Sequence, residues 1–145
     1  MDPLDLGVLD FCKTIGLAEA EIADDELLLV VQDHLITLAL DRVRGSVVMF
    51  AAAGEVGSSE ASLRRVLELN HLGQSTDGFC LGLEPGGDLV VLSHRLDAEA
   101  LRSGRLHSDF DRFVTVLERF RAGFDTAPEP EAGAHQAPSE DWIKI

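Results

Sequence analysis

The chain has 145 residues and a formal charge of −14, with 26 acidic side chains against 12 lysines and arginines. This length fits one domain, and a hydrophobic share of 46% excludes a disordered acidic protein. The negative charge argues against nucleic-acid and membrane-surface partners, because both attract clustered basic residues. The first residues lack the basic stretch of a secretory signal, and no apolar run approaches the roughly 20 residues that span a bilayer, so we expect a cytoplasmic protein.

The first half of the chain predicts one helix followed by three strands. Asp2 and Pro3 are a typical N-cap and first helical residue, and apolar residues then recur at helical spacing up to Ile15. Three short apolar runs separated by polar turns follow, over residues 27–32, 35–42 and 47–53. Runs of this length indicate an antiparallel meander. Since both faces of the third run are apolar, we expect both faces of the sheet to be covered.

The second half predicts a helix over 59–72, a β-hairpin and a long final helix. The apolar runs 79–83 and 89–94 flank a turn with one proline and two glycines, which is a strong hairpin pattern. Helical spacing returns after Asp97 and continues, after a short first turn, to Phe124. The expected fold class is therefore α+β in the order α-β-β-β-α-β-β-α, with an antiparallel five-stranded sheet packed by three helices.

The helix over 59–72 carries more apolar surface than docking on one sheet requires. Its main apolar side includes Leu63, Val66 and Leu67, and Leu69 and Leu72 form a flanking stripe. A helix that is apolar on two sides usually contacts two partners. We therefore expect a homodimer, the commonest symmetric assembly.

The composition changes abruptly after Phe124. We divide the chain into a domain over 1–124 and a Pro-rich flexible tail over 125–145, whose end is apolar through Trp142, Ile143 and Ile145. Two interpretations of this end are open. It is either an incidental apolar segment or a short docking peptide that adds as a strand to this protein or to a partner.

The sequence holds no pattern typical of catalysis or of metal binding. None of the five histidines forms a helical pair or a recognised metal motif, and nucleotide-binding and serine-hydrolase motifs are missing. Cys12 and Cys80 lie in apolar periodic positions, where inert thiols are expected. We expect no catalytic residue, no metal and no cofactor, and a small cysteine-dependent enzyme is the remaining catalytic alternative.

Several segments resemble one known family in their order and spacing. Residues 63–70 are similar to a leucine-rich helix end that closes on an asparagine, and 76–78 to the turn that follows it. Residues 81–83, Leu-Gly-Leu, and the glycine-containing hairpin into an apolar strand at 89–92 continue the likeness. With the first helix and the aromatic-rich last helix, these features resemble the class I chaperones of bacterial type III secretion, typified by CesT and SycE, over residues 1–124.

The resemblance implies a chaperone that binds the N-terminal region of one or more effectors in extended form. It would keep them soluble and secretion-competent and deliver them to the secretion apparatus, with the secretion ATPase or another export component as a further partner. Effector side chains would enter hydrophobic grooves lined by Leu6, Leu9, Ile36, Leu38, Val47 and Met49. The homodimer would pack through the second helix and a neighbouring strand, at Val66, Leu69, Leu72 and Leu81.

Several alternatives stay open on the sequence alone. Leu6 and Leu9 are either ordinary surface leucines or a binding edge, and Met49 is either a core residue or an adaptable client contact. Trp142 and its neighbours would dock in a client groove or on a delivery partner. The same fold occurs in bacterial proteins outside secretion, so a regulatory or adaptor domain is the main alternative function.

Overall fold

The computed structural model describes residues 2–124, and the predicted tail over 125–145 lies outside the described residues. The elements follow the expected order, with the final helical region divided in two: α1 (Pro3–Thr14), β1 (Glu26–Val31), β2 (His34–Asp41), β3 (Ser46–Glu55), α2 (Glu60–Leu69), the short 3-10 helix η1 (His71–Gly73), β4 (Cys80–Leu83), β5 (Leu89–Asp97), α3 (Ala98–Arg102) and α4 (Arg105–Arg119). Gly104, at a φ of 79°, makes the left-handed turn that separates α3 from α4. The predicted α+β class is confirmed.

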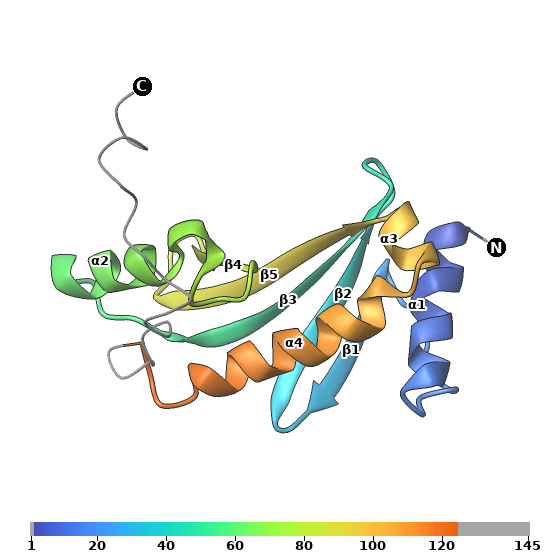
Figure 1. The fold of residues 1–145 in the computed structure, drawn as a ribbon, viewed down its shortest axis with the longest axis horizontal. Coiled ribbons are helices and arrows are strands. Elements are labelled where there is room, and N and C mark those ends of the chain that lie inside the picture. The colour runs from blue at the N-terminus through green and yellow to red at the C-terminus, as the bar shows by residue number, and fades with distance from the viewer. Residues whose placement is uncertain (1, 125–145) are drawn as a thin grey trace.

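The five strands form one antiparallel sheet in the order β1-β2-β3-β5-β4. Gln32 and Asp33 join β1 to β2 with positive φ angles of 51° and 67°, the conformation of a tight two-residue hairpin. The register of β3 against β5 shifts between Ala52 and Gly54. The two ends of the sheet carry different helices, because α1 lies at the β1–β2 end and α2 lies beside β4 (Figure 1).

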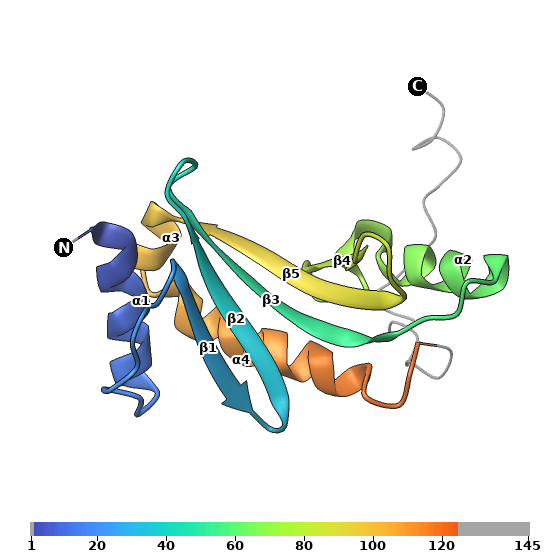
Figure 2. The same cartoon turned by 180° about the vertical axis from the view of Figure 1, so that it is seen from behind.

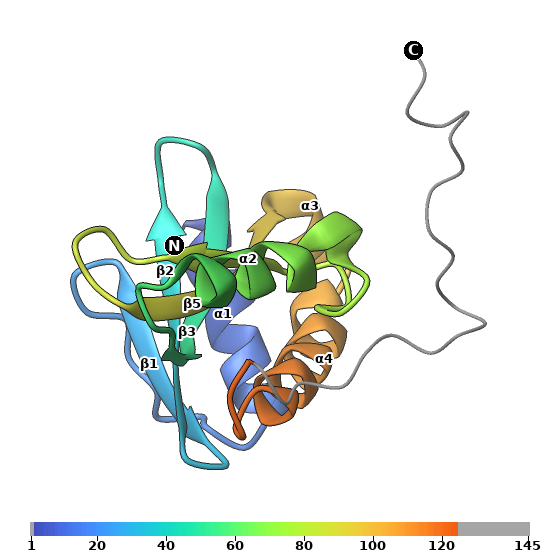
Figure 3. The same cartoon turned by 90° about the vertical axis from the view of Figure 1, so that its left-hand side faces the viewer.

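Three helices pack on the same face of the sheet. Helix α4 runs along this face, with α1 and α3 at one end of it (Figure 1), and an end-on view separates α4 from the strands as a second layer (Figure 3). Phe110 and Phe113 of α4 are buried there and contact Phe11 and Phe79 in tilted and edge-to-face arrangements, at ring-centroid distances of 5.0 and 5.3 Å. The opposite face is seen in Figure 2, where β1 and β2 lie in front of α4 and no helix of the described residues crosses them.

A buried carboxylate ties α4 to the sheet. Asp109 is only 2% exposed. One of its oxygens lies 2.8 Å from Nε2 of His94 on β5, and the other accepts a hydrogen bond of 3.0 Å from Arg112. Arg112 in turn donates to the side chain and the backbone carbonyl of Asp77, in the segment before β4. The cluster therefore joins α4, β5 and the approach to β4, and satisfies a group whose burial would otherwise be costly.

We predict that Asp109→Ala lowers the free energy of unfolding by about 3 kcal/mol, because it leaves His94 and Arg112 without their shared buried acceptor. The matched control is Asp111→Ala, which removes the same charge from an exposed position on the same helix and should change stability by less than about 0.5 kcal/mol. Urea unfolding followed by circular dichroism measures both. Equal losses in the two variants would contradict the structural role given to Asp109.

Candidate functional site

Four of the six residues predicted to line effector-binding grooves lie in the core. Ile36, Leu38, Val47 and Met49 have 0% exposed surface and pack in one cluster with the helices. Their assignment to a client groove is corrected here, because a side chain without accessible surface offers no contact to a partner. Met49 is a core methionine, which resolves the alternative left open for it by the sequence.

The error follows from the geometry of a strand. Successive side chains point to opposite faces, so choosing a client-facing set means choosing one of two alternating sets. In β2 and β3 both sets are largely apolar, and the sequence gives no local sign of which set faces α4. The residues that point away from the helices are the neighbours of those predicted: Leu35 beside Ile36, and Val48 and Phe50 on either side of Met49.

The helix-free side of the sheet is an apolar surface, which we call the outer face and define by Leu28, Val30, Leu35, Phe50 and Val91. Leu28, Val30 and Leu35 are between 55 and 73% exposed. One residue from each of the five strands pairs with its neighbour on the next strand, and together they form a row across the sheet. None of these residues is charged: Leu28, Thr37, Phe50, Ser93 and Cys80. The sequence interpretation missed this surface, although the unbroken apolar run of β1 carried the signal, since it leaves apolar residues on both faces.

A shallow hollow of about 560 Å³ lies on the outer face, over β3, β5 and β4. Its walls include Val48, Phe50 and Val91, and Pro85 comes from the β4–β5 turn. At the other side of the sheet, β2 is the one strand of the described residues that pairs with β1. Apart from a single bridge between Ala23 and Glu26, the other backbone edge of β1 has no strand partner in this range. The outer face thus combines an apolar floor with an edge strand that can accept another strand.

Helix α1 presents the remaining two predicted client residues. Leu6 is exposed and Leu9 is half-buried. Leu6 lines a groove of about 600 Å³ between α1 and α3, together with Phe11, Leu101 and His107. These two residues lie on the helical side of the domain and are separate from the outer face, so their role in client binding stays a prediction.

A charged cluster fixes the start of α1 against the sheet. Arg42, in the β2–β3 turn, lies within 3.3 Å of carboxylate oxygens of Asp2, Asp5 and Asp25. The hydrogen bonds from Arg42 hold the pKa of Asp5 below its usual value. The groove beside α1 is therefore a preformed feature, because its helix is held at its first turn by two other segments.

Three of the four predicted dimer-interface residues also belong to the core. Leu69 is 1% exposed, and Val66 and Leu81 are buried with it. Asn70 links the two elements, since its side-chain oxygen accepts a 2.8 Å hydrogen bond from the backbone of Leu81. Placing Val66, Leu69 and Leu81 at a surface is therefore corrected: they dock α2 onto its own domain.

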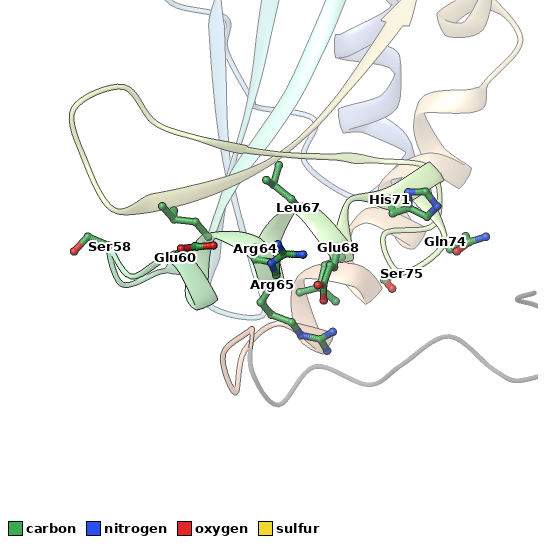
Figure 4. Close-up of a pocket in the computed structure, with 11 residues that line it drawn as sticks. Ser58, Glu60, Arg64, Arg65, Leu67, Glu68, His71, Gln74 and Ser75 are labelled. Carbon is green, nitrogen blue, oxygen red and sulfur yellow. The ribbon is translucent and has the colours of Figure 1, made fainter. Parts of the chain in front are cut away.

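The exposed side of α2 carries a different set of leucines. Leu67 is 71% exposed, and Leu63 and Leu72 are exposed as well. Leu63 and Leu67 line the α2 groove, a depression of about 880 Å³ that runs from Ser58 to Gln74 (Figure 4). Leu72 was predicted at the interface and is the one member of that set that the structure leaves at the surface, outside the helix and with a φ of 53°.

Charged side chains of both signs border the α2 groove. Arg64, Arg65 and Glu68 project from the helix near its middle, and Glu60 lies closer to its start (Figure 4). The two acids and two arginines balance, whereas the domain as a whole is acidic. The α2 groove is thus an apolar surface with a neutral border, suited to burial against another protein surface.

The described residues offer little for catalysis. Burial raises the pKa of the Cys12 thiol, which makes it a poor nucleophile. Cys80 is exposed on edge strand β4, and within residues 2–124 neither cysteine is hydrogen-bonded to a histidine. No cluster of three or more metal-ligating side chains occurs in this range. No helix in the described part of the chain is long and apolar enough to cross a membrane.

Comparison with known proteins identifies one family that the chain matches over most of its length. Residues 8–121 match the family model of the Tir chaperone protein (CesT) family. No curated protein matches the chain in sequence.

Solved structures of the same fold come from several systems. The HopA1–SchA chaperone–effector complex contains a chain that superposes with a TM-score of 0.70 at 14% identity, covering 83% of this chain and 94% of that one. The ExoT–SpcS complex from Pseudomonas aeruginosa contains another, with a TM-score of 0.62 at 23% identity and coverage of 81% and 97%. A third is YbjN, a candidate transcription regulator from E. coli, with a TM-score of 0.54 at 15% identity and coverage of 82% and 91%. At these identities the likeness shows the fold.

The two sides of α2 yield a matched stability test. We predict that Leu69→Asp lowers the free energy of unfolding by at least about 3 kcal/mol, because it places a charge without a partner in the core. Leu67→Asp, two residues away and largely exposed, should change it by no more than about 0.5 kcal/mol. Thermal unfolding of the two variants measures the difference. A stable Leu69→Asp variant would mean that α2 docks through another side.

Proposed function

Since this chain belongs to the Tir chaperone protein (CesT) family, we propose that it is a type III secretion chaperone that binds the N-terminal region of one or more effectors in extended form. It keeps the bound effector soluble and competent for secretion, and delivers it to the secretion apparatus. The observation that carries the proposal is the family match over residues 8–121 of a chain whose described domain leaves one sheet face apolar and uncovered.

The outer face provides what an extended client lacks. A non-globular segment cannot bury its own apolar side chains, and the uncharged row from Leu28 to Cys80 gives them a surface across five strands. The open edge of β1 supplies backbone hydrogen-bonding groups in the same region. Exposed Leu6 and half-buried Leu9 on α1 extend the apolar surface to the helical side, where a client that wraps around the domain passes.

The proposed chaperone works as a homodimer. Its interface is the exposed side of α2, through Leu63 and Leu67, extended by Leu72 of η1, rather than the buried residues that the sequence indicated. Residues 1–124 form the binding domain, and the function requires neither a cofactor nor a catalytic step from this chain. We place the complex in the bacterial cytoplasm, with the secretion ATPase or another export component as its delivery partner.

Client capture tests the proposed surface. We predict that the tagged protein, purified from its native bacterium under secretion-inducing conditions, retains one dominant secreted protein through that protein's N-terminal region. The double variant Val30→Asp/Leu35→Asp should lose this partner, because two charges on the outer face oppose apolar contact. Mass spectrometry of the retained proteins, repeated with fragments of the partner, measures both effects.

The control for client capture is Val43→Asp, a similar change at a 94% exposed position in the β2–β3 turn, away from the outer face. It should retain the client. Retention of the same partner by the double variant would show that clients bind elsewhere, and α1 would then be examined through Leu6→Asp.

The α2 interface has its own test. We predict that Leu67→Asp converts the dimer to a folded monomer, since a charge at the centre of an apolar interface would be left without a partner on association. Light scattering over a concentration series measures the molar mass, with Val43→Asp as the control that stays dimeric. A dimer that persists in Leu67→Asp would exclude the exposed side of α2 as the interface.

The fold match to YbjN favours a second candidate function, that of a regulatory or adaptor domain outside secretion. The two functions predict different proteins bound to this chain when it is purified from cells. A clean protein without a secreted client, with unchanged secretion after deletion of the gene, would favour the regulatory function. The cysteine-dependent enzyme has less support, because the Cys12 thiol is buried; full function of a Cys12→Ala/Cys80→Ala variant would remove it.

A further inference from the structure

The α2 groove differs from the rest of the domain in charge. Residues 1–124 carry 21 acidic and 11 basic side chains, so most of the surface repels an acidic segment. Around the groove, Arg64 and Arg65 balance Glu60 and Glu68, and Leu63 and Leu67 supply an apolar floor. A segment that is both apolar and acidic therefore meets less repulsion here than on the outer face, whose β1 edge is flanked by Asp24, Asp25, Glu26 and Asp33.

This chain contains such a segment outside the described residues. Residues 140–145 read Glu-Asp-Trp-Ile-Lys-Ile, with two acids followed by the only tryptophan of the protein and two isoleucines. A tryptophan offers a large apolar area at a small cost in conformational entropy. The two acids precede it directly, so they would reach the arginines of the border when the aromatic ring enters the groove.

The last described residue lies at the border of the α2 groove. Arg65, which lines the groove, donates a 3.3 Å hydrogen bond to the carbonyl oxygen of Phe124, the last described residue. Phe124 is buried, with its ring 5.4 Å from that of Phe120, so the described part of the chain ends at the groove border. Seventeen residues separate Phe124 from Trp142. A chain of seventeen residues reaches at most about 60 Å when fully extended, and linkers of this length give local concentrations in the millimolar range.

We propose that residues 140–145 dock in the α2 groove of their own protomer, with the Trp142 ring against Leu63 and Leu67 and the acids beside Arg64 and Arg65. Because the groove is also the proposed dimer surface, the segment competes with a second protomer for it. This inference rests on the proposed dimerisation through α2. The dimer then forms only when the segment leaves the groove, which makes assembly dependent on any event that captures the segment.

The single tryptophan makes the docking directly measurable. At concentrations where light scattering reports a monomer, we expect the emission of the wild-type full chain to be blue-shifted and protected from acrylamide quenching. In Leu67→Asp the emission should shift red and the quenching should approach that of the urea-unfolded chain. Val30→Asp, on the outer face, is the matched control and should leave Trp142 protected.

Competition is measured by removing the segment. A chain that ends at residue 138 should dimerise about tenfold more tightly than the full chain if the groove is free about a third of the time in each protomer, because both protomers must be free to associate. Arg64→Glu in the full chain should also release Trp142, since it adds repulsion next to the two acids.

Several results would overturn the inference. One is equal quenching of Trp142 in the wild-type and Leu67→Asp monomers. Loss of protection in Val30→Asp would place the segment on the outer face, and protection that grows with concentration would place it on a partner protomer. A dimer that persists at the lowest concentration and is unaffected by the truncation would also exclude competition. None of these readouts involves a client, so they leave the chaperone proposal to its own test.

Discussion

The structure depends on one constraint: a sheet with apolar residues on both faces has helices on only one of them. Helices α1, α3 and α4 all pack on the side of Ile36, Leu38 and Met49, where burial of their aromatic and aliphatic side chains supplies the main driving force for folding. The outer face consists of the other side chains of the same strands, which point away from these helices. Because its side chains alternate with the core residues, a strand cannot gain its buried face without also presenting the other. The surface proposed for clients is thus a consequence of how the core is built.

Much of the fold could be predicted from the sequence, because strands, turns and helices are specified locally. The hairpin at 84–88, the cap at Asp2 and the helical spacing after residue 105 are each contained in a few neighbouring residues. The functional surface could not be predicted in the same way. Whether Ile36 or Leu35 faces α4 depends on the packing of an element 70 residues further along the chain, and both residues are equally apolar. Local pattern defines two faces, and tertiary contact decides which of them is the core.

The side of α2 that packs on the domain could not be predicted from the sequence either. The amphipathic pattern indicated a helix with two apolar sides and assigned Leu69 to the partner and Leu67 to the domain, whereas the structure buries Leu69 in the domain and leaves Leu67 exposed. The bond from Leu81 to the Asn70 side chain fixes the rotation of the helix end, and this bond joins residues 11 positions apart. This polar contact acts together with the burial of Val66 and Leu69, which leaves Leu63 and Leu67 exposed.

Charge and apolar surface act over different distances in this protein. An acidic shell attracts basic client segments at long range and weakens as salt screens it, whereas the uncharged rows of the outer face act only on contact. The same shell repels an acidic segment, and a surface with balanced charge repels such a segment less. In the α2 groove, Arg64 and Arg65 provide that balance on the face where a second protomer would bind. The surfaces proposed for client capture and for assembly are therefore separate, and they differ in the balance of charge at their borders.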